Sequence, residues 1–459
     1  MNPMNEMSRR AMLRSAACGF GYLAFAGLAS EVAAAAESAS YQNPLAPRTP
    51  HFAPRAKRVI FMFMQGGPSH LDTFDHKPSL DKMDGERSGN RQYFASPFKF
   101  NRHGSSGLPI SELYPHLAQH ADDLCMLNGM HTDNPAHPQA TIMLHTGSSL
   151  FVRPSIGSWV LYGLGTVNQN LPGFVTINPL SRLGGAQNYG SAFLPAAYQG
   201  MKLGSDGRDG DDGALPNLKN PSLAAPLQRR QLDLVQSMNR DLLQRQGVNT
   251  EIEGVIESFE LAFKMQATVP DVLDIRGESQ ATLDSYGIGK GATDRFGMQC
   301  LMARRFAEAG VRFIEVTHTG WDHHNNLNKR LSANAQATDQ PIAALLTDLK
   351  QRGMLEDTLL VWGGEFGRTP YGQGRDGRNH NNRGYTMWLA GGGVKGGLRF
   401  GATDDTGYEA VENKVHTHDL HATILHLLGL DHEKLTYRYS GRDFRLTDVH
   451  GVVPREILA

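Results

Sequence analysis

The residues best suited to chemistry stand in one short segment, Trp321-Asp322-His323-His324, which follows a strand candidate at residues 311–316. That stretch has the pattern of a buried strand, so the segment is expected where a strand ends. An aspartate with histidines one and two positions later brings oxygen and imidazole ligands around one point. A surface histidine run is the alternative, but it leaves the preceding Gly320 and Trp321 unexplained. The segment is therefore the strongest local indication of a metal site.

A second group of polar residues follows another strand-like run, residues 57–64. That run ends in the sequence QGGPSH at residues 65–70, which must be a loop, and Gln65 or Asp72 can offer an oxygen ligand. Ligands of open α/β sheets bind outside the carboxyl ends of the strands, so this loop and the Asp322 loop are expected to meet. An ordinary Gly-Pro turn is the competing interpretation.

A third group centres on His137. Pro135 or Pro138 suits the first turn of a helix, and Gly147 suits its end. His137 is therefore expected at a helix N-terminus, where the helix dipole favours anions. For His145, farther along the same helix, a packed and hydrogen-bonded core position is the better interpretation.

A fourth group follows the apolar run at residues 358–362. Glu365 stands at its end, where a buried carboxylate is costly unless it is paired or metal-bound. Arg368 can neutralise Glu365 in a structural salt bridge, or it can hold an anionic substrate in a bidentate contact. His380 follows shortly afterwards, ahead of a further apolar run.

The elements that must position these residues alternate between buried strands and amphipathic helices, which predicts a mostly parallel sheet with helices on both faces. The expected strands are residues 57–64, 124–127, 174–177, 311–316, 358–362 and 386–390, and the main helices are 296–308, 333–352 and 418–428. Residues 179–222 read as irregular, and two helices are expected at 227–246 and 250–266. We expect residues 179–292 to be an insertion over one end of the sheet rather than an independent domain.

The composition and the N-terminus restrict the class of protein. The chain has 459 residues, with 45 basic against 46 acidic side chains, a balance that excludes a dedicated nucleic-acid binder. Residues 1–36 carry a twin-arginine pair, Arg9-Arg10, a mildly apolar run and an alanine-rich cleavage region, which together predict a Tat export signal. Residues 37–56 then form a linker or surface wrap, and no membrane span is expected after cleavage. The predicted location is the periplasm or the exterior.

The order of these segments resembles the alkaline phosphatase/sulfatase superfamily, most closely its exported DUF1501 branch, across nearly the whole length after the signal. The matching segments are the opening strand, His145-Thr146-Gly147, Trp321-Asp322-His323-His324, Glu365-Phe366-Gly367-Arg368-Thr369-Pro370, His380 and Val415-His416-Thr417-His418-Asp419-Leu420. The resemblance implies one α/β domain over residues 57–459, an alkaline-phosphatase-like three-layer sandwich. It also implies one or two divalent metal ions, Zn, Mn or Ca, at the carboxyl edge of the sheet.

The resemblance assigns expected roles to particular positions. Asp322, His324 and His380 look like one metal site, with His323 as the competitor of His324. Glu365 occupies the place of an aspartate that helps to hold a second metal. His137 falls at the place of the nucleophile, and Gln65 falls where an acid is expected. Arg368, Ser69 and His70 are expected to contact the substrate, and Asp72 and Thr141 are alternates.

The residues His137 and Gln65 depart from the superfamily pattern, and so does the absence of a sulfatase motif. These departures restrict the nucleophiles that the protein can use. The chain has no Cys-x-Pro/Ala-x-Arg sequence, so formylglycine sulfatase chemistry is excluded. The nucleophile can then be a metal-activated water, His137 itself, or Ser69 or Thr141 from an altered position. The expected function is an exported metal-dependent hydrolase of small phosphate or sulfate esters. The alternative is a noncatalytic periplasmic metal-binding or assembly protein that keeps the fold.

Overall fold

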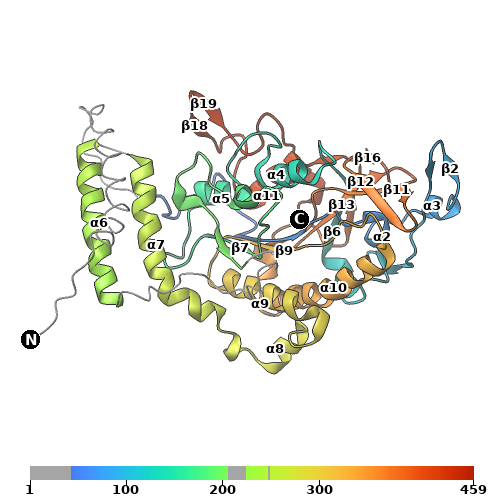
Figure 1. The fold of residues 1–459 in the computed structure, drawn as a ribbon, viewed down its shortest axis with the longest axis horizontal. Helices are drawn as coiled ribbons and strands as arrows, with labels where there is room; N and C mark the ends of the chain where they lie inside the picture. The colour runs from blue at the N-terminus through green and yellow to red at the C-terminus, as the bar shows by residue number, and fades with distance from the viewer. Residues whose placement is uncertain (1–42, 205–223, 247–248) are drawn as a thin grey trace, which may run out of the picture.

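The computed structural model describes residues 43–204, 224–246 and 249–459. Helices cover both faces of one central nine-stranded sheet (Figure 1). The expected export signal, residues 1–36, lies outside the described residues. Among the helices that are described, none is long and apolar enough to cross a membrane.

The central sheet has the strand order β14-β6-β13-β10-β1-β9-β7-β8, with β17 also paired to β6. Its strands are β1 (Arg58–Met64), β6 (Leu124–His131), β7 (Phe174–Ile177), β8 (Met201–Leu203), β9 (Phe313–His318), β10 (Thr358–Gly363), β13 (Tyr385–Ala390), β14 (Leu398–Phe400) and β17 (Val415–His416). β13 runs antiparallel to both of its neighbours, and the other pairings of this sheet are parallel. The prediction of a mostly parallel sheet is confirmed.

Two hydrophobic cores lie on the two faces of the sheet. In β1, Val59 and Phe61 face one core while Ile60 and Met62 face the other, as the alternation of side chains along a strand requires. The first core is closed by α4 (His137–Thr146), α5 (Ile156–Leu164) and α11 (Thr417–Leu427), and the second by α9 (Asp294–Glu308) and α10 (Leu327–Gln351) (Figure 1). Each fully buried apolar side chain contributes roughly 1.5–3 kcal/mol, so these cores hold the strand ends in place.

The expected insertion is only partly separate from the sheet. Its two helices, α6 (Ala225–Gln246) and α7 (Thr250–Leu273), form a pair at one end of the molecule (Figure 1). Within the segment that we expected to be irregular, however, β8 pairs in parallel with β7 and extends the sheet. A strand of three residues in a Gly- and Asn-rich context gives no periodic signal, which explains why the sequence did not reveal it.

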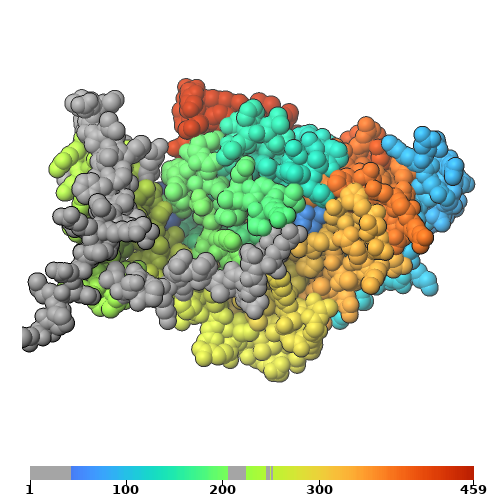
Figure 2. Space-filling model, viewed as in Figure 1, coloured from blue at the N-terminus to red at the C-terminus, as the bar shows by residue number. Residues whose placement is uncertain are grey.

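The remaining elements are short. In Figure 1, β2 (Arg87–Ser88) and β3 (Arg91–Gln92) lie at one end of the molecule, and β18 (Tyr437–Tyr439) and β19 (Arg442–Phe444) lie at its upper edge. In Figure 2 the same segments appear in blue and dark red. The other strands are β4 (Phe100–His103), β5 (Leu108–Ser111), β11 (Gly367–Gln373), β12 (Gly377–Asn381), β15 (Ala402–Thr403) and β16 (Ala410–Glu412). The other helices are α2 (His70–Thr73), α3 (Pro78–Lys82), α8 (Gln280–Ser285) and the 3-10 turns η1 (Leu117–Asp123), η2 (Gly185–Tyr189), η3 (Ala196–Tyr198), η4 (Ile275–Gly277), η5 (Gly291–Thr293), η6 (Leu355–Asp357) and η7 (Arg455–Ile457).

Candidate metal centre

Four segments bring side chains together beyond the carboxyl ends of β9 and β10. The loop after β9 carries Asp322 and His324, and the loop after β10 carries Glu365. α4 begins at His137, as predicted, and ends at a left-handed Gly147. The β11–β12 hairpin supplies Arg368 and His380, which lie directly opposite each other in register.

A glycine lets two of these loops touch. Gly66 has a φ of +119°, and a Cβ atom there would stand 2.5 Å from the backbone nitrogen of Asp322. Its own N–H donates to both carboxylate oxygens of Glu365, at 3.0 and 3.1 Å. The loop after β1 therefore fixes both the Asp322 backbone and the Glu365 side chain, and no larger residue fits at this position.

Three imidazoles converge on a single carboxylate oxygen, Oδ1 of Asp322. The Nε2 atom of His324 lies 3.0 Å from it, and the Nε2 atoms of His137 and His380 each lie 3.3 Å from it. The ligand atoms of His137, Asp322 and His380 all lie within 4.8 Å of one another. The side chain of Asp322 is 39% exposed, so the cluster is open to solvent.

The opposite nitrogen of each ring is held by an oxygen acceptor. The Nδ1 contacts are His137 to Glu365 Oε1 at 2.5 Å, His380 to the Pro135 carbonyl at 2.7 Å, and His324 to Gln373 Oε1 at 2.6 Å. An acceptor at Nδ1 places the ring proton there and leaves the Nε2 lone pair free. All three Nε2 atoms thereby face Asp322, and each can bind a cation when its ring is in that neutral form.

Two of these nitrogens lie too close for both to present a lone pair. His324 Nε2 and His380 Nε2 are 2.9 Å apart. Two lone pairs facing each other at this distance repel unless a proton or a metal cation lies between them. A divalent ion relieves this repulsion and also neutralises part of the charge on Asp322.

The charges of the cluster shift its pKa values in opposite directions. Burial opposes a charge on His137, but the carboxylates of Asp322 and Glu365 outweigh it and raise the pKa of His137 to about 9. Burial would raise the pKa of Asp322, yet its contacts with His137 and His380 and the charge of Arg368 hold that pKa well below its usual range. Burial, followed by the charges of Arg368 and His137, lowers the pKa of His380. At physiological pH Asp322 is therefore ionised, His380 is neutral and His137 is protonated, so a metal ion that binds at His137 Nε2 would displace a proton.

Arg368 has a different role from the one we expected. Its side chain is fully buried, and its Nη2 contacts Asp322 Oδ1 at 2.6 Å. Nε donates to the Gly67 carbonyl at 2.9 Å, Nη1 to the Arg378 carbonyl at 3.2 Å, and Nη2 also to the Gly66 carbonyl. Its guanidinium is thus bound to protein oxygens on every side, rather than being available to an anionic substrate, and its carboxylate partner is Asp322 instead of Glu365.

Several other expected site residues are held by partners of their own. Ser69 Oγ donates to Asp72 Oδ2 at 2.5 Å, and Asp72 forms a buried pair with Arg378 at 2.7 and 3.0 Å. His70 is buried, and its Nε2 bonds to the Gly407 carbonyl at 2.8 Å. Neither Ser69 nor His70 is therefore exposed to a substrate, and Asp72 is occupied as an ion-pair partner.

The remaining alternates also lie apart from the converging ligands. Thr141 is fully buried in α4, and His323 is fully buried behind the loop. Burial, with the charge of Arg368, lowers the pKa of His323 to about 3, so His323 is a neutral core residue. Gln65 contributes its backbone, whose N–H bonds to the His318 carbonyl at 2.9 Å. His145 is buried and bonded through Nδ1 to the Thr141 carbonyl at 2.7 Å, as expected.

Three contributors to the centre escaped the sequence argument. The ring of Phe366 packs against two imidazoles, with centroids 4.7 Å from His137 and 4.6 Å from His380. Gln373 and the Pro135 carbonyl supply the Nδ1 acceptors described above. The position of Phe366 directly after Glu365 is visible in the sequence and could have suggested that it lies at the site. Nothing in the sequence indicates that the Pro135 carbonyl or the Gln373 amide would contact a histidine.

Comparison with known proteins identifies a family for the chain. The family model described as "Protein of unknown function (DUF1501)" matches residues 56–458. No curated protein matches the chain.

Among solved structures, the chain is similar to a sulfatase from Pseudoalteromonas sp., with 12% identity, a TM-score of 0.36, and coverage of 88% of this chain and 72% of that one. It is similar to a protein in the alkaline phosphatase superfamily from Vibrio parahaemolyticus, with 9% identity, a TM-score of 0.36, and coverage of 90% and 76%. It is also similar to the alkaline phosphatase of the Antarctic bacterium TAB5, with 10% identity, a TM-score of 0.32, and coverage of 83% and 99%. Likenesses this distant do not identify a reaction.

Proposed function

The chain belongs to the DUF1501 family, and we propose that it is a metal-dependent hydrolase of small anionic esters. The observation that carries the proposal is the convergence of three imidazole Nε2 atoms on one carboxylate oxygen. The proposed ligands are Asp322 Oδ1 and the Nε2 atoms of His137, His324 and His380.

The side chains fit a divalent ion on their own chemistry. His137 Nε2 is a buried polar atom without a hydrogen-bond partner among the described residues, and it faces Asp322. Imidazole is a good ligand for Zn²⁺ and other transition metals, whereas Ca²⁺ prefers an all-oxygen set. We therefore favour a single transition-metal ion. Glu365 is the residue that orients His137, because its oxygens are bonded to His137 Nδ1 and the Gly66 N–H.

The chemistry follows from what the chain's own residues can do. A bound divalent ion acidifies a coordinated water and polarises an ester oxygen. The ionised Asp322 carboxylate supplies the negative charge that attracts the ion, and Glu365 keeps the proton of His137 on Nδ1. The two hydroxyls considered as nucleophiles, Ser69 and Thr141, are both buried, so we propose water as the nucleophile.

We further propose that the protein acts outside the cytoplasm. The support is the sequence around Arg9-Arg10 and the alanine run at residues 33–36. Tat export carries folded proteins, so the metal would be loaded before export. Phosphate and sulfate esters are the proposed substrates.

A noncatalytic metal-binding role is the second candidate, and one observation favours it. Arg368, the cation expected to clamp an anion, has all its nitrogens directed at protein oxygens. A site without an anion clamp can hold a metal and yet bind an ester weakly. Periplasmic assembly or metal retention would then be its role.

Metal analysis of the exported protein, followed by ester assays, tests both candidates. We expect about one equivalent of transition metal in the wild type and a large loss of metal in Asp322→Asn, with Asp405→Asn as an exposed control. Hydrolysis of p-nitrophenyl phosphate, its diester or p-nitrophenyl sulfate by wild type but not by Asp322→Asn supports the hydrolase. Metal without hydrolysis supports the noncatalytic role. Wild-type protein that takes up no metal overturns both.

A further inference from the structure

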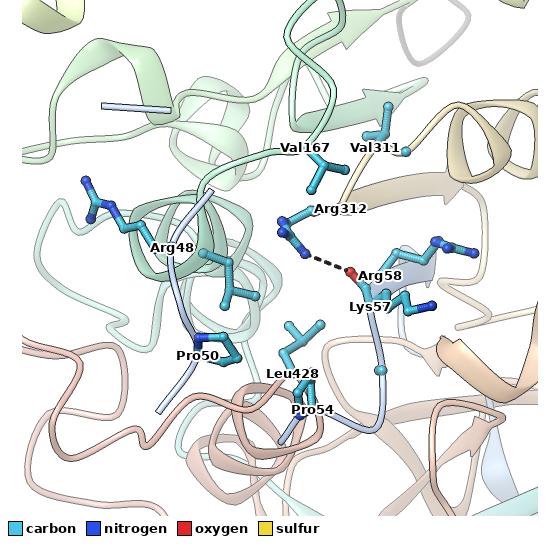
Figure 3. A pocket seen from close by; sticks show the side chains of 12 residues that line it. Arg48, Pro50, Pro54, Lys57, Arg58, Val167, Val311, Arg312 and Leu428 are labelled. Atoms are coloured by element: carbon cyan, nitrogen blue, oxygen red, sulfur yellow. Dashed lines mark hydrogen bonds between the residues drawn. The ribbon is translucent and has the colours of Figure 1, made fainter. Parts of the chain in front are cut away.

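A second cavity lies at the opposite edge of the sheet from the metal centre. It is formed where β1 and β9 begin, between Arg58 and Arg312, and its volume is about 260 Å³ (Figure 3). One wall is the segment before β1. This segment is fixed to the end of α11, because the N–H groups of Arg55 and Ala56 both donate to the Leu427 carbonyl at 2.8 Å. The cavity is therefore a built feature of the fold.

The lining of this cavity has basic side chains but no acidic one. The basic side chains are Arg48, Lys57, Arg58 and Arg312. The guanidinium of Arg48 is bonded to residues outside the lining, the Tyr162 and Pro44 carbonyls and the Tyr198 hydroxyl. Arg58 and the exposed Lys57 share one carboxylate outside the lining, Asp357, at 3.1 and 2.9 Å. An exposed pair such as Lys57 with Asp357 contributes little stability. The Lys57 side chain points away from Arg312 in Figure 3, and a change of rotamer would bring it to an anion bound there.

Arg312 is a cation of this lining that has a fixed orientation and, among the described residues, no carboxylate partner. Its Nε donates to the Gly165 carbonyl at 2.7 Å and its Nη1 to the Lys57 carbonyl at 3.3 Å, so the guanidinium is held in one orientation (Figure 3). No residue that the structure describes bonds to its Nη2 or offers it a carboxylate. Burial, and then the charge of Arg58, lowers the pKa of Arg312. Arg312 is therefore a half-buried cation that has unused N–H donors and no carboxylate partner within the described part of the chain, and such a group can bind an anion.

The rest of the lining is apolar. Val167, which is 64% exposed, stands at the rim beside Arg312, while Leu428 is fully buried on the opposite side (Figure 3). Covering Val167 would remove apolar surface from water, which is favourable by roughly 25 cal/mol per Å². A bare oxyanion would leave this surface exposed.

We propose that this cavity binds a small amphipathic oxyanion. Its carboxylate or phosphate group is held by Arg312, with Lys57 as the mobile second cation, and its apolar part lies against Val167 and Leu428. Guanidinium suits such a group because its N–H donors match two oxygens of a carboxylate or phosphate. The site is separate from the metal centre and does not depend on the proposed hydrolysis.

Calorimetric titration tests the proposal with two non-hydrolysable or inert probes, phenylphosphonate and benzoate, and with inorganic phosphate as the bare oxyanion. We expect at least one organic probe to bind wild type more tightly than phosphate does, and Arg312→Gln to weaken that binding at least tenfold. Arg240→Gln, an equal charge change on the exposed face of α6, should bind as wild type does. The same comparisons are repeated in the Asp322→Asn background, where the proposed metal centre cannot contribute binding of these oxyanions, and they should give the same differences.

The rim offers a pair of variants that does not disturb the core. Val167→Asp places a negative charge beside Arg312, whereas Val167→Asn has nearly the same shape without the charge. Binding at least tenfold weaker in Val167→Asp than in Val167→Asn supports the site. Equal binding by this pair, or unchanged binding by a folded Arg312→Gln, overturns it. In the Asp322→Asn background, binding of phosphate as tight as that of both organic probes does so as well.

Discussion

The Nδ1 atom of His137 and the Oε1 atom of Glu365 lie 2.5 Å apart, although 228 residues separate them in the sequence. This contact joins the first residue of α4 to the loop after β10. It turns the other nitrogen of His137 toward Asp322 Oδ1, at 3.3 Å. A carboxylate that orients a metal-binding imidazole in this way also increases its basicity.

Glu365→Gln tests that relationship directly. The amide keeps an acceptor for His137 Nδ1 but removes the negative charge, so the imidazole becomes less basic. We expect metal affinity to fall by about 10–100-fold, measured by competition with a chelator of known affinity. Glu356→Gln, at an exposed position, should leave affinity unchanged. Equal affinity in Glu365→Gln and wild type would show that Glu365 does not act on the metal through His137.

Gly66→Ala should damage the centre through the backbone. The added Cβ would stand 2.5 Å from the Asp322 nitrogen, and the φ of +119° is itself unfavourable for alanine. Gly89→Ala is the matched control, because its φ is +61° and a Cβ there meets nothing within 4 Å. Strain of this backbone kind costs on the order of 1–3 kcal/mol, so Gly89→Ala measures the strain alone. We expect Gly66→Ala to lose more stability than Gly89→Ala in urea unfolding and to lose metal as well. Similar losses in the two variants, with metal retained, would contradict the close approach of the loops.

Acid should destabilise the fold through His421. Burial, and then the charge of His418, lowers the pKa of His421 to about 3, while Nε2 donates to the Leu144 carbonyl at 2.7 Å. Because the unfolded chain binds a proton near pH 6.5 and the folded chain does not, stability is full above pH 6.5 and falls as the pH drops toward 3. His421→Gln can still donate to Leu144 but cannot titrate. Between pH 7 and pH 5 we expect wild type to lose about 2 kcal/mol more of its unfolding free energy than this variant does. Parallel losses in urea titrations would show that His421 is already protonated in the fold.

Export depends on residues that the structure does not describe, so its prediction rests on sequence alone. Replacing Arg9 and Arg10 together by lysine keeps the charge but removes the twin-arginine pair that the export machinery reads. We expect the variant to remain in the cytoplasm with its N-terminus intact, whereas wild type is processed near Ala36. Fractionation and N-terminal mass measurement check this. Processing at normal yield in the double variant would rule out Tat export.

The sequence predicted the elements better than the partners of the side chains. Long apolar runs such as residues 59–64 identify buried strands because burial on both faces leaves no room for polar residues. The closeness of Asp322 and His324 follows from their spacing. The pairing of His137 with Glu365 depends instead on the order of strands in the sheet, which local patterns do not encode. Gln373 lies near a hairpin turn, where a polar side chain is expected whether or not it binds anything.

A variant of Arg368 distinguishes a structural role of this residue from a role in substrate binding. From the sequence, Arg368 could clamp a substrate or neutralise a carboxylate; in the structure it is fully buried, bound to Asp322 at 2.6 Å and to the carbonyls of Gly66 and Gly67. Lysine would keep the charge but lacks the planar set of donors, so Arg368→Lys leaves buried carbonyls without partners. We expect a loss of about 2–4 kcal/mol in unfolding free energy together with weaker metal binding, because Asp322 is no longer fixed. A substrate clamp would behave differently: stability and metal content would stay at wild-type levels, and only KM for the ester would rise. Unfolding curves, metal content and KM measured on the same preparation therefore decide between the two roles.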